Sequence, residues 1–540
     1  MRPEPSLRLR LTRDAQGWRV DAQRCDPQRW RTLRSADSAR SVYLFRPHDR
    51  RLEALADAEL EQQIRAILSR RAWPDLCTLL EIDFALVVLD CRASGVLLAR
   101  GGVGRERLFH RTGAGTFEVE SDLLHHVDPH SVDREAFSAY LASAAGPVSG
   151  DLTFTARTVA SAAGWMRCAR AAVTEIDLDG GTSSTHRYTL RPDAQLRQLS
   201  DSDLAQAMRE AVGSHLARRM ADDVCAVELS GGIDSSVIAA NVAQLDPSRC
   251  HVGVGVVYPY HEFRHETQYM EDMARKANVQ RIELDGRHHL LFDETPTAGP
   301  ATSEPSLVLM GRAYKALVID AARGAGARVL FNGHGGDQLF AMSPYVQESL
   351  VRPLDFRLLD GALRSEVQDQ LAQYRSDLEQ RDEFGQRHYF AGLLLYDGWM
   401  EDFARGTGLR CEPGLLSLRT LQLSWEMFRR PHWVDTGILR KRFARWAFSA
   451  DLPESIVQRR WKVGYDGLYR RGLFRNAPRL TGLLQGQSEH LRSMGIRVER
   501  CLAMLERARE MRFDDVELLY PILCYALWRA SLAPCAAAVK

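Results

Sequence analysis

A chain of 540 residues is too long to fold around one ordinary hydrophobic core, so we expect two or three domains. Its hydrophobic share of 45% and its charged share of 26% are typical of a soluble globular protein. Because the formal net charge is only +1, the chain has no basic field to gather nucleic acid, and tRNA or DNA is disfavoured as a substrate.

The cysteines and the N-terminal segment indicate the cellular compartment of the protein. The ten cysteines form no CxxC pair and no His/Cys cluster with metal-ligand spacing. Cys91, Cys225 and Cys524 lie in apolar runs and are predicted to be reduced core residues. We find no signal-length apolar stretch at the N-terminus and no segment that approaches a membrane span. We therefore expect a cytoplasmic protein.

The first two hundred residues are predicted to be rich in β-structure. Leucines alternate with polar residues over Leu7–Leu11, the period-two pattern of a half-buried strand. Two further strands are predicted at Phe84–Leu89 and Gly95–Ala99, joined by a polar turn. A short helix is predicted over Ser131–Ala145.

The pattern changes to alternating helices and strands after a break at Arg191–Asp193, and we divide the chain into domains at residues 1–195 and 196–540. The elements predicted in order are helix Asp203–Met220, strand Val224–Leu229, helix Ser235–Ala243, strand His251–Val257, helix His265–Ala277, strand Gln280–Leu284, helix Val308–Ala322 and strand Arg328–Phe331. This alternation predicts an α/β fold with a doubly wound parallel sheet, whose ligands lie beyond the carboxyl ends of the strands. Beyond about residue 350 the chain is predicted to be mostly helical.

A glycine-rich loop, Ser230-Gly-Gly-Ile-Asp-Ser235, follows the first strand of this part and leads into a helix. Adjacent glycines let the backbone approach an anion, Ser230 and Ser235 add hydroxyl donors, and the helix N-terminus adds N–H groups and a favourable dipole. Asp234 could hold Mg²⁺ against phosphates. The alternative is a tight strand-to-helix turn with an Asp/Ser cap. The loop is not of the kinase type, because the chain contains no G-x-x-x-x-G-K-[ST].

A second glycine-rich element, Gly333-His-Gly-Gly-Asp337, follows strand Arg328–Phe331. Asp234 and Asp337 at adjacent strand ends could share the metal ions that shield a departing pyrophosphate. Alone, this element could be a turn, but paired with the first loop it predicts a phosphate site.

These two elements, about a hundred residues apart, resemble the asparagine-synthetase superfamily. The segment Leu452–Tyr465 is similar to that family's stretch ending in a lysine, a glycine and an aromatic residue. The resemblance implies that a substrate carboxylate attacks the α-phosphate of ATP, giving an acyl-adenylate and pyrophosphate, and that an amine then forms an amide. It also implies a catalytic Lys462, which would stabilise charge on the α-phosphate and on the tetrahedral intermediate.

The same resemblance implies the cofactors, which are ATP and Mg²⁺, and the residues that hold them. Asp234 and Asp337 are the metal ligands that it implies. The nucleotide-binding residues that it implies are Leu229, Ser230, Gly231, Gly232, Asp234, Ser235, Val254 and Gly333.

The N-terminal part, around Ala99–Gly104 and Glu120–Leu123, resembles more loosely the glutaminase (Ntn-type, αββα) domain of asparagine synthetases. That domain needs a cysteine as its first residue, because the free α-amine serves as the base. Here Met1 is followed by Arg2, and Cys25 would need an unusual cleavage. The family's glutamine-holding Asn-Gly pair is missing too, so we expect an inactive domain.

Without glutamine-derived ammonia, the amine must come from the substrate or from solution. Superfamily members with a silent N-terminal domain include the β-lactam synthetases and the lasso-peptide cyclases, which close a ring within one molecule. His334 stands where asparagine synthetases carry an acidic residue and β-lactam synthetases a tyrosine. An imidazole titrating near neutrality could take a proton from a peptide's α-ammonium group, although His334 could instead only hydrogen-bond within its loop.

The preferred interpretation is a lasso-peptide macrolactam cyclase that joins an Asp or Glu side chain of a precursor peptide to the peptide's N-terminal amine. Its expected partners are the linear precursor peptide, a leader-binding protein and a leader peptidase, with no nucleic acid and no membrane span. The alternatives are a β-lactam synthetase, an asparagine synthetase that uses free ammonia, and a scaffold without catalytic activity.

Overall fold

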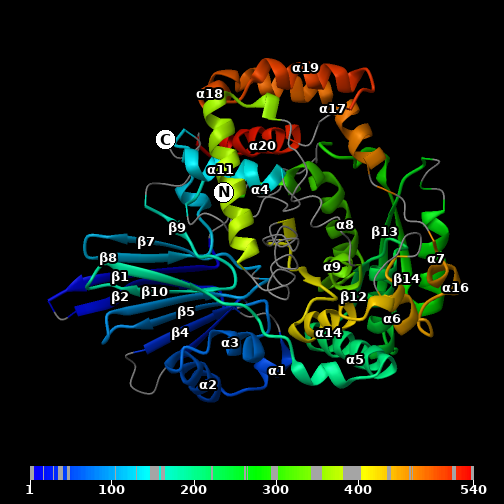
Figure 1. Ribbon diagram of the computed structural model, residues 1–540, viewed down its shortest axis with the longest axis horizontal. Helices are drawn as coiled ribbons and strands as arrows, with labels where there is room; N and C mark the ends of the chain where they lie inside the picture. The colour runs from blue at the N-terminus through cyan, green and yellow to red at the C-terminus, as the bar shows by residue number, and fades with distance from the viewer. Residues whose placement is uncertain are drawn as a thin grey trace.

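The computed structural model of the protein describes most of the chain, namely residues 5–15, 17–27, 29–34, 40–45, 49–103, 105–128, 130–145, 157–159, 164–220, 223–260, 263, 265–293, 302–341, 356–380, 403–404, 406–433, 440–460, 464, 466–513 and 518–536. It is a mixed α/β structure with two antiparallel sheets and one parallel sheet (Figure 1).

The N-terminal part is a sandwich of the two antiparallel sheets. The five-stranded sheet has the order β2-β1-β8-β7-β9, with β1 (Leu7–Asp14), β2 (Gly17–Cys25), β7 (Phe109–Gly113), β8 (Thr116–Glu120) and β9 (Met166–Arg167). The six-stranded sheet has the order β11-β10-β6-β5-β4-β3, with β3 (Trp30–Arg34), β4 (Arg40–Phe45), β5 (Ala85–Asp90), β6 (Gly95–Arg100), β10 (Ala172–Asp177) and β11 (Thr182–Arg187). The three strands predicted here correspond to β1, β5 and β6.

Alternating apolar side chains fill the space between these two sheets. Leu7, Leu9 and Leu11 of β1 are buried with Val87 of β5 and Val119 of β8 in one hydrophobic cluster. The opposite face of the six-stranded sheet is covered by α2 (Asp57–Ser69) and α3 (Trp73–Leu80), which follow the short α1 (Arg50–Glu53). The period-two pattern therefore marks the sheet-to-sheet face.

The second part contains the predicted parallel sheet, in the order β14-β13-β12-β15-β16. Its strands are β12 (Cys225–Glu228), β13 (Val252–Val257), β14 (Gln280–Asp285), β15 (Val329–Asn332) and β16 (Arg410–Pro413), and every neighbouring pair is parallel. The described residues beyond 350 are mostly helical, as expected, and β16 adds a short strand to the parallel sheet. Because the chain runs outward from β12 on one side and from β15 on the other, these two strands mark the topological switch point.

Helices cover both faces of the parallel sheet. Cys225 and Val227 of β12 face the side of α5 (Asp201–Arg219), α6 (Ile233–Leu245), α14 (Leu418–Phe428) and α15 (Arg442–Ala447). Ala226 faces α8 (Arg312–Gly324), which follows the 3₁₀ turn η5 (Leu307–Gly311). Since side chains alternate along a strand, Glu228 also falls on the α8 face. The remaining helices here are α7 (Glu266–Ala277), α9 (Gly336–Phe340) and α16 (Glu454–Val457).

A separate helical layer closes the end of the molecule opposite α5 (Figure 1). It joins the N-terminal α4 (Arg134–Ala145), the predicted short helix, to α11 (Gly361–Glu379), α17 (Asp466–Gly486), α18 (Ser488–Ser493), α19 (Val498–Arg509) and α20 (Leu519–Ala536) around one cluster of buried side chains. No helix in the described part of the chain is long and apolar enough to cross a membrane.

A buried ion network connects the sandwich to the parallel sheet. Arg105, in the loop after β6, donates from Nε to Asp83 over 2.6 Å and from Nη2 to Glu412 of β16 over 2.9 Å. Both carboxylates are buried, and Arg219 of α5 lies 3.6 Å from Glu412. The predicted boundary between residues 195 and 196 falls in the 3₁₀ turn η2 (Ala194–Gln198), and the division into two domains stays a prediction.

The predicted core cysteines divide into two groups. Cys225 and Cys524 are buried, as expected, whereas Cys91 is half-buried in the turn after β5. The prediction for Cys91 was wrong because the apolar run ends at Leu89; Asp90 ends β5, and Cys91 begins the turn.

Candidate active site

The loop after β12 is held in shape by its own hydroxyl groups. The backbone N–H of Ser230 donates to Oγ of Ser235 over 3.2 Å, and the hydroxyl of Ser236 donates to the carbonyl of Gly232 over 2.7 Å. Gly231 has φ +71°, and a β-carbon there would lie 2.9 Å from Cβ of Tyr269. Only glycine takes this conformation at little cost in so tight a space. The loop thus opens directly into the N-terminus of α6, a geometry that suits an anion.

The second element lies directly beside the first, because β15 is the neighbour of β12 in the sheet. A β-carbon on Gly336 would lie 2.3 Å from Cγ of Asp234. The close approach of the two loops therefore depends on glycine at position 336. Asp337 lies in the first turn of the short helix α9 and is largely exposed, whereas the side chain of Asp234 is mostly buried.

Lys441 connects the two aspartates, a contact that sequence reasoning missed. Its Nζ forms an ion pair with Asp234 and lies 2.7 Å from Oδ1 of Asp337. Burial disfavours the charged form of this lysine, but the two carboxylates outweigh that effect and raise its pKa. Lys441 also has φ +57°, a strained conformation for a residue with a side chain. The chain has only five lysines, and that scarcity was the one sequence signal that could have marked Lys441.

The two aspartates fit the predicted Mg²⁺ by the chemistry of their donor atoms. Mg²⁺ is usually bound through one or two carboxylates together with phosphate oxygens of a substrate. Asp234 and Asp337 supply two carboxylates that already share one cationic group, Nζ of Lys441. In the described part of the chain, no group of three or more His, Cys, Asp or Glu residues could hold a metal by itself. A metal here would therefore take its other ligands from a phosphate substrate and water.

Lys462 and Tyr465 of the predicted lysine segment lie outside the described residues, as does Gly104 of the glutaminase-like stretch. Three residues before Lys462, however, Arg459 reaches the phosphate loop. Its Nη1 donates to the carbonyl of Gly231 over 3.0 Å, and its guanidinium lies 4.3 Å from the ring centre of Tyr269. Arg459 also forms an ion pair with Glu266 of α7. Sequence reasoning missed Arg459, which fixes the back of the loop.

A pocket of about 680 Å³ lies at the switch point, beyond the ends of β12 and β15. Its polar wall contains Ser230, Asp234, Ser235, Gly333 and Asp337 among the predicted site residues. Its apolar wall contains Tyr258, Leu290, Leu291, Leu307, Val308, Met310, Leu468 and Tyr469. A pocket of this volume, mostly apolar with a few convergent polar groups, is typical of a small-molecule or cofactor site.

Four predicted nucleotide-binding residues do not belong to the pocket lining. Leu229 and Val254 are buried, and the N–H of Leu229 donates to the carbonyl of Val254 over 2.8 Å. Gly231 and Gly232 shape the loop, but neither belongs to the pocket lining. Their assignment to nucleotide binding stays a prediction.

His334 lines the pocket, and one of its ring nitrogens is fixed. Oδ1 of Asn332 accepts from the backbone N–H of His334 over 3.1 Å and lies 2.9 Å from Nδ1. Since an amide oxygen only accepts, the neutral ring carries its proton on Nδ1, and Nε2 is the acceptor nitrogen.

Titration of His334 near neutrality, as expected from the sequence, is not supported. Burial, together with the charge of Lys315, lowers the pKa of His334 to about 4, against the opposing effects of Glu228 and Asp337. The imidazole is therefore neutral at physiological pH and able to accept a proton, but it is a weaker base than predicted.

Glu228, Tyr314 and Lys315 form a second set of polar side chains in the pocket. Its Oε1 accepts from the hydroxyl of Tyr314 over 2.6 Å and from Nζ of Lys315 over 2.9 Å, both on α8. Burial would raise the pKa of Glu228, but Lys315, His334 and the Tyr314 hydrogen bond outweigh it and lower the pKa. Glu228 is therefore an anion in the site, and neither it nor Lys315 was predicted as a site residue.

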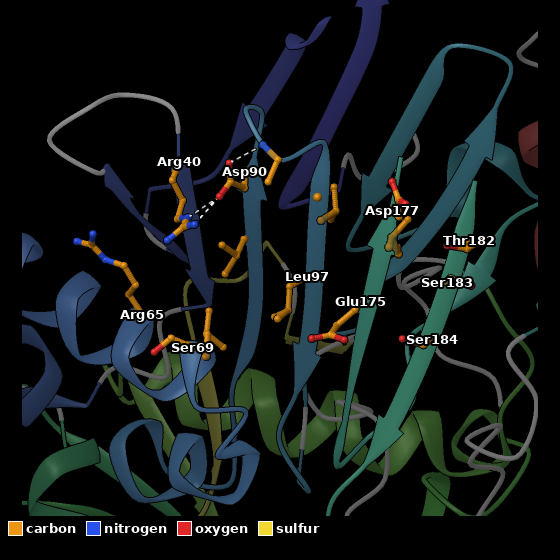
Figure 2. A pocket seen from close by; sticks show the side chains of 16 residues that line it. Arg40, Arg65, Ser69, Asp90, Leu97, Glu175, Asp177, Thr182, Ser183 and Ser184 are labelled. Atoms are coloured by element: carbon orange, nitrogen blue, oxygen red, sulfur yellow. Dashed lines mark hydrogen bonds and ion pairs between the residues drawn. The ribbon is translucent and has the colours of Figure 1, made fainter. Parts of the chain in front are cut away.

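A second hollow of about 590 Å³ lies on the six-stranded sheet, next to α2 (Figure 2). Figure 2 shows Arg40 of β4 directed at Asp90 of β5, with an Nε–Oδ2 distance of 3.1 Å. Glu175, Asp177 and the serines and threonine of β11 complete its wall. None of the predicted site residues lies in this hollow.

Comparison with known proteins supports the family resemblance over part of the chain. Residues 203–437 match the asparagine synthase family. The carboxyethyl-arginine β-lactam-synthase of Streptomyces clavuligerus is 33% identical over 132 residues, which are 24% of this chain and 26% of that protein. The chain thus matches only about a quarter of that relative's length. Both matches support a resemblance to the asparagine-synthetase superfamily.

Similarities to solved structures are weaker. The NMN synthetase from Francisella tularensis is 14% identical over 45% of this chain and 99% of its own, with a TM-score of 0.18. A structure of the allosteric regulatory enzyme of purine biosynthesis is 10% identical over 61% of this chain and 84% of its own, with a TM-score of 0.22. Neither score supports a conclusion about this chain.

Proposed function

We propose that this chain is an AMP-forming amide synthetase that activates a carboxylate with ATP. The observation that carries the proposal is the group Asp234–Lys441–Asp337, placed at the switch point of a parallel sheet beside a pocket of about 680 Å³. A carboxylate oxygen attacks the α-phosphorus of ATP, the bond to the β-phosphate breaks, and pyrophosphate leaves. An amine then attacks the acyl carbon, AMP leaves, and one amine proton passes to a base.

The residues of the site take distinct roles in this reaction. The loop from Ser230 to Ser235 and the N-terminus of α6 hold the phosphates. Asp234 and Asp337 would hold Mg²⁺, which supplies charge neutralisation at the pyrophosphate. Lys441, together with Lys462, balances charge on the phosphates. His334, which lines the pocket, would accept the amine proton.

For the substrate, we propose a linear precursor peptide, so that the chain acts as a lasso-type macrolactam cyclase in the cytoplasm. It would adenylate an Asp or Glu side chain and join it to the peptide's N-terminal amine, after a leader-binding protein and a leader peptidase have delivered the peptide. The resemblance to the superfamily supports this choice, since its members with a silent N-terminal domain include the β-lactam synthetases and the lasso-peptide cyclases, and both close a ring within one molecule.

A second candidate is a β-lactam synthetase-like enzyme that closes a small ring. It is favoured by the 33% identity to a carboxyethyl-arginine β-lactam-synthase. A third is an asparagine synthetase-like enzyme that uses free ammonia. All three share the same activation chemistry and differ in the amine.

One experiment separates these candidates. The purified protein is incubated with ATP and Mg²⁺ and, in turn, with linear peptides carrying a free N-terminus and an internal Asp or Glu, with carboxyethyl-arginine, and with aspartate plus ammonium chloride. Pyrophosphate, AMP and product mass are measured. We expect a peptide product lighter by one water. Turnover of carboxyethyl-arginine alone would favour the second candidate, and ADP in place of AMP would contradict the proposed chemistry.

A further inference from the structure

One carboxylate oxygen in the active-site pocket has a function still to be assigned. Glu228 uses Oε1 for Tyr314 and Lys315, but its Oε2 is buried and has no hydrogen-bond partner among the described residues. A buried polar atom without a partner is rare, and in a pocket it commonly marks the position of a ligand group. The side chain is only 13% exposed, so bulk water does not replace such a partner.

The position of Glu228 restricts what this group can be. A carboxylate that remains ionised can only accept hydrogen bonds, so its ligand must donate N–H or O–H groups. His334 lines the same pocket, interacts electrostatically with Glu228, and presents Nε2 as a second acceptor. Glu228 and His334 therefore line the same pocket and are close enough to interact electrostatically. An amine nitrogen, which has two or three N–H bonds, can donate to both.

The surroundings of Glu228 strengthen such a contact. Leu307, Val308 and Met310 form the neighbouring apolar wall of the pocket. A charge-assisted hydrogen bond is stronger in such a poorly solvated place than in water. Tyr314 and Lys315 hold the carboxylate in one orientation, so little ordering is needed when a ligand binds.

We propose that Glu228 binds the amine group of the substrate that attacks the activated carboxyl, with Oε2 accepting one N–H while His334 faces another. The inference rests on the proposed function and deepens it, since it selects substrates that bring a primary amine into the pocket. It makes Glu228 an amine-binding residue and leaves the activation of the carboxylate to the phosphate loop.

Direct binding tests this inference without turnover. Butylammonium is the probe and 1-butanol its uncharged control, and binding is measured by saturation-transfer NMR. Glu228→Gln keeps an oxygen for Tyr314 and Lys315 but replaces Oε2 with a donor. We expect butylammonium to bind this variant about tenfold more weakly than wild type, and 1-butanol to show no difference. The matched control is Glu271→Gln on the surface of α7, which should bind butylammonium like wild type.

Turnover provides the second readout, with the carboxylate substrate that proves active in the panel above. We expect Glu228→Gln to form at least fivefold less amide per pyrophosphate released. If this variant instead raises the KM for ATP and leaves that ratio unchanged, Glu228 contacts the adenine amino group and the inference is wrong. Equal binding of butylammonium to wild type and variant would also overturn it.

The two proposals fail in different ways. If the wild-type protein releases no pyrophosphate with any carboxylate, the proposed function fails, and the NMR comparison alone decides whether Glu228 binds amines. Glu228→Asp, which keeps the charge on a shorter side chain, should restore part of the butylammonium binding. Circular dichroism of each variant establishes that it is folded.

Discussion

Arg105 and Glu412 form a buried ion pair of 2.9 Å that connects residues 307 positions apart. The pair connects the loop after β6 of the sandwich to β16 of the parallel sheet. Because Arg105 also binds Asp83, its removal would leave two buried carboxylates without their main cation.

We expect Arg105→Met to lower the free energy of unfolding by about 3 kcal/mol, since breaking a buried pair leaves uncompensated charge. Thermal unfolding followed by circular dichroism and calorimetry measures the change. The control is Arg492→Met, whose ion pair with Glu499 is exposed on both sides and should contribute far less to stability. Equal effects of the two substitutions would show that the Arg105 network does not stabilise the fold.

Replacement of Lys441 should affect chemistry more than folding. We expect Lys441→Met to reduce pyrophosphate formation by about a hundredfold or more, because a positioned cation next to the transferring phosphate is removed. Steady-state release of pyrophosphate measures this effect. Lys276→Met, on the exposed side of α7, removes the same charge from the surface and should retain wild-type turnover. A similar loss in both variants would contradict a specific role for Lys441.

His334 should act after activation of the carboxylate. We expect His334→Gln to slow amide formation at least tenfold more than pyrophosphate release, because the glutamine can fill the space but cannot take a proton. Rapid-quench measurement of the acyl-adenylate, AMP and product separates the two steps. If both steps slowed equally, His334 would have a structural role through Asn332 and not a role as base.

The buried His215 should make the fold sensitive to acid. Its Nε2 donates to the carbonyl of Pro413 over 3.0 Å, and burial, with nearby Arg219, lowers its pKa from 6.5 to about 4. The unfolded chain therefore takes up this proton near pH 6.5 and the folded chain only near pH 4. The contribution of His215 to the free energy of unfolding is complete above pH 6.5 and decreases as the pH falls. By pH 4 it has decreased by about 3 kcal/mol.

Urea unfolding between pH 7.5 and 4.5 tests this expectation. His215→Gln keeps a donor for Pro413 but cannot be protonated, so its stability should fall less steeply with decreasing pH than that of wild type. His288→Gln, at an exposed position, is the control and should follow the wild-type curve. If the free energy of unfolding of His215→Gln depended on pH as steeply as that of wild type, the acid sensitivity would come from other groups.

The elements of the parallel sheet were predictable where apolar runs end in glycine-rich loops. The predicted strand Val224–Leu229 became β12, and Asp234 and Asp337 lie at neighbouring strand ends as expected. The sandwich was less predictable. In β11 the sequence Thr-Ser-Ser-Thr-His-Arg is polar and mostly exposed, so no apolar alternation marks it, and its strand form comes from pairing with β10.

The site residues that were missed share one cause. Lys441 lies 207 positions from Asp234, and Arg459 lies 228 positions from Gly231, so only the tertiary fold brings each pair together. Glu228 lies within a predicted strand. Whether its side chain contacts α8 depends on which face of the sheet that helix covers, and only the tertiary fold decides this. A motif locates the phosphate loop, but it does not identify the side chains that other parts of the chain bring to it.

Lys441 affects how the proposed site would bind a nucleotide. Its ammonium group already pairs with both Asp234 and Asp337, so half of the negative charge of the two carboxylates is balanced from the start. Under the proposed function, a divalent ion that arrives with a nucleotide would compete with this internal counter-ion, and the displaced ammonium could turn toward phosphate oxygens. Nucleotide binding would then be an exchange of cations, and its free energy would depend on the difference between the metal–carboxylate and the lysine–carboxylate interactions.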